Sequence, residues 1–389
     1  MKKFLKWLFI IFIIIPVVFL AGIWLSYTFY IDWEMHKQSH NKIVDNEYCW
    51  GMGCRTQEKN LEEFFPILSG QMKVMAPAVK KIWPWADFSK IKAYFINKQK
   101  TKSWIVWWDW KIEDYSASKF LEKYPVMWYD LEFGFDEKEP QSMYLVVSDD
   151  EMRKQEGLES YPYLWTYDPA LTVIHEGFHY FIQDASFNKG TDEVSRIEVL
   201  TNQRARTQRT WIIELFKKAL ITQDKEKKEQ FLKQAKYFFE IYKKENPKEF
   251  IITRYFDTIE WTAAYVETLS ALSWKNKGNF DREQLNKMLI SMYSKVDYFD
   301  FAVWAVNEWY TIWSLAGYIL DQLEENPDDW KKKIQNNPKT SPVIYLLSKY
   351  EIEKSEIPET FKEKVKKEIK KKSGYSWKPV IKFIYDITF

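Results

Sequence analysis

The stretch that decides the fold reads Leu171-Thr-Val-Ile-His-Glu-Gly-Phe-His-Tyr-Phe-Ile-Gln183. Its apolar residues recur at intervals of three and four, which predicts an amphipathic helix whose apolar stripe faces a core. His175 and His179 are four residues apart, so a helix places both imidazoles on one face, one turn apart. This spacing is typical of two ligands of a single Zn²⁺, and Glu176 would then lie beside the metal.

The chain has only four histidines in 389 residues, and two of them stand in this motif. A chance His-Glu-x-x-His is expected in about one of three hundred chains of this composition. The competing interpretation, an ordinary pair of helical histidines without a metal, is therefore much weaker. His36 and His40 repeat the spacing, but no glutamate follows the first of them.

A catalytic zinc site needs a third protein ligand and an open position for water. No histidine follows His179, so a carboxylate must supply the third ligand. Glu198 follows after eighteen intervening residues, and Glu260 lies in a later predicted helix, so the spacing leaves both open. Glu267 is two turns beyond Glu260 and on nearly the same helical face, so we expect it to accept a hydrogen bond from a ligand imidazole.

A resemblance can be stated on these residues. The motif His175-Glu-Gly-Phe-His179, followed by Glu260-Trp-Thr-Ala-Ala-Tyr265-Val-Glu267, resembles the gluzincin metallopeptidases, in particular those whose second motif reads Glu-Gly-x-Ala-x-Tyr. The resemblance extends from about residue 168 to residue 321. It implies that Glu260, rather than Glu198, completes the zinc site. In this chain Trp261 replaces the glycine of the second motif.

The expected chemistry follows from this set of residues. Zn²⁺ lowers the pKa of a bound water, and Glu176 would act as the general base on that zinc-bound water. Tyr265, or Arg254 on the same predicted helix, is expected to donate a hydrogen bond to the oxyanion that forms. Tyr265 is five positions from Glu260, about 140° around a helix, so both reach one cavity only if it wraps around the helix.

The N-terminal region predicts a membrane anchor. Residues 7–30 form an almost unbroken apolar run, long enough to cross a bilayer. Three lysines precede the run and two acidic residues follow it, which favours a cytoplasmic N-terminus and an extracytoplasmic main body. A cleaved signal peptide is the alternative. Outside the cytosol, Cys49 and Cys54 are expected to form one local disulfide rather than a metal site.

The remaining patterns predict an α+β fold that is predominantly α. Short aromatic and β-branched runs at 103–110, 127–133 and 142–147 indicate a small aromatic-rich sheet. Helical periodicity prevails from residue 168 onward and predicts a zincin-like helical domain. Three prolines between residues 61 and 96 favour short helices and loops there. We expect four parts: a cytoplasmic tip and transmembrane anchor at 1–31, a juxtamembrane and β-containing region at 32–165, a metallopeptidase-like domain at 166–325, and a C-terminal helical extension at 326–389.

The composition excludes several classes of protein. With 46% apolar residues the chain has enough material for a core, and a net charge of +2 gives no support to nucleic-acid binding. We therefore expect a membrane-anchored, extracytoplasmic zinc hydrolase, most simply a metallopeptidase acting on peptides or cell-surface polymers. One alternative is a non-catalytic anchored binding or structural module with an inactive zinc motif. Another is a zinc hydrolase that cleaves a bond other than a peptide bond.

Overall fold

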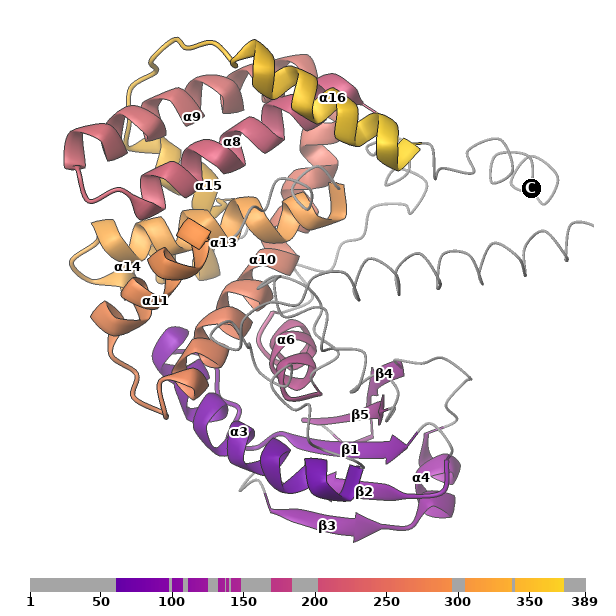
Figure 1. Ribbon diagram of the computed structural model, residues 1–389. Coiled ribbons are helices and arrows are strands. Elements are labelled where there is room, and N and C mark those ends of the chain that lie inside the picture. Colours follow the sequence, from indigo (N-terminus) through magenta and orange to yellow (C-terminus); the bar gives the residue numbers. More distant parts are fainter. Residues whose placement is uncertain are drawn as a thin grey trace, which may run out of the picture.

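The computed structural model describes residues 61–97, 100–107, 111–124, 132–136, 138–139, 141–147, 169–183, 202–295, 305–337 and 340–373. Over these ranges the protein is mostly helical with one small mixed sheet, so the expected α+β class with a predominance of helix is confirmed (Figure 1).

The sheet has five strands in the order β3-β2-β1-β5-β4. Their bounds are β1 Lys92–Asn97, β2 Ser103–Val106, β3 Ile112–Tyr115, β4 Glu132–Phe135 and β5 Ser142–Val147. The central strands β1 and β5 pair in parallel, and the other neighbours pair antiparallel. Among the described residues, β4 is the last strand in this order and so forms an edge of the sheet.

Alternation along the strands divides the sheet into two packed faces. Phe95 and Leu145 point into the main core, on the face that α3 (Leu61–Ile82) and α6 (Pro169–Phe181) cover (Figure 1). Tyr94 and Val146 point to the opposite face and pack against Phe120 of the short helix α4 (Ala117–Lys123). The central strands β1 and β5 are therefore buried on both sides.

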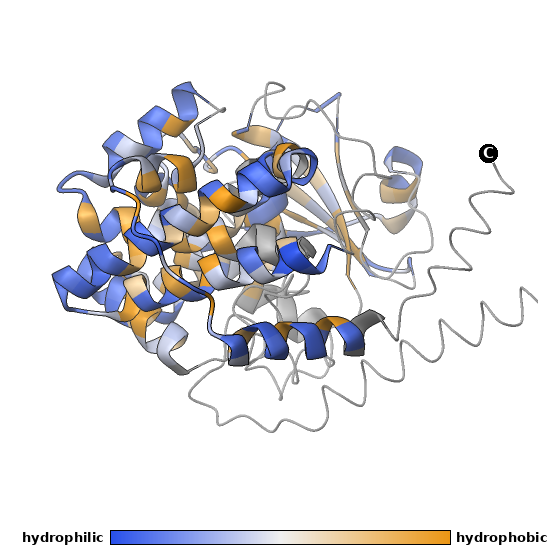
Figure 2. Cartoon of the chain, turned by 90° about the horizontal axis from the view of Figure 1, so that it is seen from above, coloured by the Kyte–Doolittle hydropathy of each residue, from blue (hydrophilic) through white to orange (hydrophobic). Residues whose placement is uncertain are grey.

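The helical part follows the sheet in sequence. Its helices are α8 Gln203–Ile221, α9 Lys225–Glu245, α10 Pro247–Lys275, α11 Arg282–Lys295, α13 Ala305–Leu323, α14 Pro327–Asn336, α15 Pro342–Ser348 and α16 Glu359–Ser373. Side-chain caps start several of them: Asn202 accepts from the Ala205 amide, and Asp224 accepts from two amides of α9. Figure 2 shows hydrophobic residues gathered toward the interior of this layer, with hydrophilic ones outside.

The 29-residue helix α10 connects the two parts of the fold. It packs against α3 and α6 on the side of the sheet and against α9, α11 and α13 within the helical layer (Figure 1). Ala263, Val266 and Leu272 are buried on different sides of this helix. A helix surrounded in this way can present functional side chains to more than one neighbour.

Two expectations about the region 61–97 are wrong. The helix α3 runs for 22 residues through both Pro66 and Pro77, where we expected short helices and loops. Each internal proline costs a hydrogen bond and about 3 kcal/mol. The buried stripe of Leu68, Met72 and Val79 offsets this cost by placing one face of the helix in the core. Residues 92–97 form strand β1, which the sequence analysis did not predict.

The expectations about the strands are tested by the structure, whereas those about the N-terminal region are not. The strand expected at 142–147 is confirmed as β5, and β2 covers the first part of the run expected at 103–110. No described helix is long and apolar enough to cross a bilayer. The expected anchor at 7–30 and the cysteines Cys49 and Cys54 lie outside the described residues. The anchor, the disulfide and the four-part division of the chain remain predictions.

A polar network holds the edge of the sheet to α4. Lys123 Nζ lies 2.8 Å from Asp136 Oδ2 and also pairs with Glu139. The Tyr124 hydroxyl donates to Asp136 Oδ2 at 3.0 Å, and the backbone amide of Lys138 donates to Oδ1 at 2.9 Å. Burial opposes ionisation of Asp136, but these hydrogen bonds outweigh it and lower its pKa from 3.8 to about 2.

This shift predicts acid-sensitive stability. A lowered folded-state pKa means that ionised Asp136 stabilises the native state above about pH 4 and that this contribution disappears as the pH falls toward 2. The shift corresponds to about 2 kcal/mol. We expect Asp136→Asn to lower the free energy of unfolding by about this amount at pH 7 and to flatten its pH dependence between about 4 and 2.

Urea unfolding at a series of pH values measures both effects. Asp114→Asn removes an exposed carboxylate from β3 and is the matched control. Equal stability of wild type and Asp136→Asn at pH 7 would contradict the proposed role of the network.

Candidate metal centre

The helix α6 is held rigidly in the core. Leu171, Ile174 and Phe178 form its buried stripe, and it packs against α3, α10 and β5. At Gly177 a Cβ atom would come within 3.1 Å of the Phe88 ring, so the glycine allows this ring to lie close to the helix. The local sequence thus fixes the helix that carries the motif, and the face bearing His175 turns toward α10.

The structure brings His175, His179 and Glu260 together. The Nε2 atoms of the two imidazoles lie 3.1 Å apart. Oε2 of Glu260 lies 3.2 Å from Nε2 of His179 and 3.6 Å from Nε2 of His175. Among the described residues these three form the one group of histidine and acidic side chains with the geometry to hold a metal ion.

The remaining ring nitrogens are also engaged. Nδ1 of His175 lies 2.8 Å from Oε2 of Glu267, and Nδ1 of His179 lies 2.8 Å from Oε1 of Gln183. An ionised carboxylate only accepts hydrogen bonds, so Nδ1 of His175 carries the hydrogen. The same tautomer suits His179, because the amide oxygen of Gln183 is an acceptor. Both Nε2 lone pairs are then left to face Glu260.

The triangle of these three atoms fits a metal ion. A tetrahedral Zn²⁺ with ligands at about 2.0–2.1 Å holds them roughly 3.3 Å apart. The observed separations of 3.1, 3.2 and 3.6 Å bracket this value. Two unprotonated Nε2 atoms and a carboxylate at these distances repel one another unless a cation or a proton lies among them. The donor set therefore accommodates zinc.

The electrostatics of the group favour a positive charge at its centre. Burial opposes protonation of His175, but Glu260 and Glu267 outweigh it and raise its pKa well above the ordinary value. Burial also raises the pKa of Glu260, whereas hydrogen bonds from the two histidines hold it far below its usual range. A divalent cation would satisfy the same preference.

Glu176 follows the first histidine and interacts electrostatically with the group. Burial raises the pKa of its carboxyl, and the charges of His175 and His179 oppose that effect. The side chain is partly buried but retains access to solvent. Its position beside the triangle is the one that the sequence motif predicts for a general base.

Two other expected site residues have different outcomes. Tyr265 is buried, its hydroxyl donates to Oδ2 of Asp321 at 2.5 Å, and its ring stacks on Tyr318. Burial and the charge of Asp321 raise the pKa of Tyr265 well above its ordinary value. The hydroxyl thus bonds to α13 rather than to the histidine group. This agrees with the position of Tyr265 on the helix, about 140° around from Glu260. Glu198 lies outside the described residues.

Glu267 was expected from the sequence, whereas Gln183 was not. Gln183 is four residues beyond His179, one turn further along the chain, and this spacing was the available signal. Comparisons with protein-family models, with curated proteins and with solved structures find no match to this chain.

The contact between His175 and Glu267 predicts an effect on metal affinity. Groups that orient a ligand histidine typically contribute 10–100-fold to metal binding. We expect Glu267→Gln to weaken Zn²⁺ binding by about tenfold, because the amide oxygen still accepts from Nδ1 but the negative charge is lost. Competition with a chromogenic chelator measures the affinity.

Glu240→Gln neutralises a partly exposed glutamate of α9 and is the control. Equal Zn²⁺ affinity of Glu267→Gln and Glu240→Gln would show that the hydrogen bond to His175 does not tune the site.

Proposed function

We propose that this protein is a membrane-anchored zinc metallopeptidase that acts outside the cytoplasm. The observation that carries the proposal is the triangle of His175, His179 and Glu260, with Glu176 beside it on the same helix. The resemblance of the two motifs to the gluzincins supports a zincin-like arrangement of α6 and α10.

The donor set argues for zinc. Two imidazoles and one carboxylate leave a fourth coordination position for water or substrate, which is the pattern of catalytic zinc sites. Magnesium and calcium favour oxygen ligands, so a pair of imidazole nitrogens disfavours them. We assign His175, His179 and Glu260 as the zinc ligands.

Each side chain of the site then has a separate role in hydrolysis. A Zn²⁺ held here would polarise a carbonyl oxygen and make a neighbouring water more acidic. Glu176 accepts the proton of the attacking water and delivers it to the leaving amine. Glu267 and Gln183 keep the two imidazoles turned so that Nε2 of each faces the centre. Burial of α6 keeps these positions fixed.

The edge of the sheet supports a peptide substrate. β4 lies at the end of the strand order, and its Phe135 stacks on Tyr180 of α6 with ring centroids 3.9 Å apart. An edge strand offers backbone groups with which an extended chain can pair. This edge adjoins the helix that carries both histidines, so a peptide paired there would lie near the metal centre.

The membrane location rests on the apolar residues 7–30 and the lysines that precede them. This arrangement supports an extracytoplasmic body, where peptides or cell-surface polymers are the accessible substrates.

The alternative of a non-catalytic binding module is less well supported. It relied on aromatic strand residues between 103 and 148 to hold a ligand, but Trp104 is buried in the main core and Tyr144 packs against Phe120 and Tyr124. A purely structural zinc site would also have no use for Glu176.

Glu176→Gln tests the assignment of the base. The amide cannot accept the proton, so we expect hydrolysis of a peptide library to fall by a factor of about 10²–10⁴. Bound zinc should stay at the wild-type level, because Glu176 is not a ligand. Mass spectrometry of cleaved peptides and elemental analysis of the same preparations provide the two readouts.

His175→Ala is the companion variant, in which both zinc and hydrolysis should be lost. Full activity of Glu176→Gln would overturn the role of this residue as base. Wild-type zinc content in His175→Ala would overturn the site itself.

The third ligand is tested separately. Glu260→Ala is expected to lose the metal, and Glu198→Ala is expected to retain it, because Glu260 lies 3.2 Å from a histidine nitrogen. Zinc stoichiometry after dialysis distinguishes the two variants. Loss of zinc in the Glu198 variant alone would reverse the assignment.

A further inference from the structure

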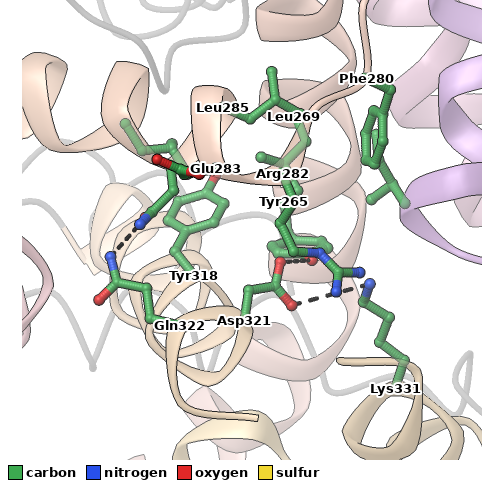
Figure 3. A pocket seen from close by; sticks show the side chains of 13 residues that line it. Tyr265, Leu269, Phe280, Arg282, Glu283, Leu285, Tyr318, Asp321, Gln322 and Lys331 are labelled. Carbon is green, nitrogen blue, oxygen red and sulfur yellow. Dashed lines mark hydrogen bonds and ion pairs between the residues drawn. The ribbon is translucent and has the colours of Figure 1, made fainter. Parts of the chain in front are cut away.

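A cavity of about 380 Å³ lies within the helical part of the protein (Figure 3). Its walls come from α3, α10, α11, α13 and α14. The volume lies within the range of small-molecule sites, which are mostly apolar with a few placed polar groups. Tyr265 of α10 lines the cavity, whereas Glu260 and Glu267 of the same helix contact α6. It is therefore distinct from the candidate metal centre.

One part of the cavity wall is apolar. Leu269 of α10 and Leu285 and Leu289 of α11 line it, together with Phe280 and Ile82. The three leucines are buried. Such a wall accommodates a short aliphatic chain and gains free energy when the chain leaves water.

The carboxylates in the polar wall, those of Asp321 and Glu283, already have partners. Oδ2 of Asp321 accepts from the Tyr265 hydroxyl at 2.5 Å, and Oδ1 accepts from Nε1 of Trp330 at 3.0 Å. Glu283 is exposed and pairs with Lys287 at 2.6 Å. Neither carboxylate therefore needs a further donor.

The two cations in the same wall, Lys331 and Arg282, are less fully engaged by carboxylates. Lys331 is 1% exposed, and its Nζ has carboxylate oxygens at 3.7 Å (Asp328) and 4.0 Å (Asp321), both beyond hydrogen-bond distance. Its ammonium makes no closer hydrogen bond to any described residue. Arg282, at the exposed mouth, has no carboxylate of a described residue within 4.0 Å. Burying an ammonium with unfilled donors is costly.

The two cations face one another across the polar end. Figure 3 shows Lys331 reaching toward Asp321 and the guanidinium of Arg282. Burial lowers the pKa of Lys331 and the charge of Arg282 adds to this effect, whereas Asp321 and Asp328 oppose it. An occupant that supplies acceptors and a negative charge would fill these donors and reduce the repulsion between the two cations.

We infer that this cavity is a binding site for a small monocarboxylate with a short aliphatic chain. The carboxylate would accept from Lys331 and from the planar fork of Arg282, which suits two carboxylate oxygens. The chain would lie along Leu269, Leu285 and Leu289. A single charge is favoured, because Asp321 offsets one of the two cations in the wall. This site does not depend on the proposed peptidase activity.

The test uses the full-length protein and three probes. 4-Methylpentanoate carries both features, 4-methylpentanamide is its neutral counterpart, and acetate lacks the chain. Ligand-observed NMR titration measures each affinity. We expect saturable binding of the acid, at least tenfold weaker binding of the amide because the charge-assisted hydrogen bonds are lost, and weaker binding of acetate because the apolar contacts are lost.

Three variants locate the binding. Lys331→Met keeps the length of the side chain and removes the ammonium, and Arg282→Met changes an exposed residue. Each should weaken binding of the acid at least tenfold. Lys332→Met removes an exposed lysine from the same helix and should bind as the wild type does.

Three results would overturn the inference. The first is the absence of saturable binding of 4-methylpentanoate. The second is equal affinity for acid and amide. The third is unchanged affinity in Arg282→Met, which stays informative even if Lys331→Met fails to fold.

Discussion

Two carboxylates of one helix hold one imidazole of another, and the candidate metal centre depends on this contact. Glu260 and Glu267 of α10 lie on either side of the His175 ring, next to Nε2 and Nδ1 respectively. Seven residues separate the two glutamates, so two helical turns place both on the face that meets α6. Because buried polar groups need partners, this arrangement fixes how the two helices pack as well as how the imidazole is turned.

The helix α10 serves two parts of the protein from different faces. Its glutamates face α6 and the histidines, whereas Tyr265 and Leu269 face the cavity bounded by α11, α13 and α14. The hydrogen bond from Tyr265 to Asp321 anchors this second face. A helix packed on several sides resists local movement, so both sites are built on a rigid element.

Some features of the fold and of the candidate site could be predicted from the sequence, and others could not. The four-residue spacing of His175 and His179 predicted that their rings share a face, and the Nε2 atoms do meet. Glu267 was expected to accept a hydrogen bond from an imidazole of the motif, and its Oε2 lies 2.8 Å from Nδ1 of His175. The helix α3 was missed, because the local cost of its prolines was weighed without the burial of its apolar stripe. Strand β1 was missed because pairing with β2 and β5 stabilises it.

By itself the sequence determined what depends on neighbours along the chain: the helical pairing of His175 with His179, the shared face of Glu260 and Glu267, and the mainly α fold class. Only the tertiary structure shows that Glu260 lies beside the histidines and that the Tyr265 hydroxyl points to Asp321. Glu260 is 81 residues from His179, and Tyr265 is 56 residues from Asp321. Helical periodicity fixes direction over a few turns, whereas contacts across such separations are set by the packing of whole helices against a common core.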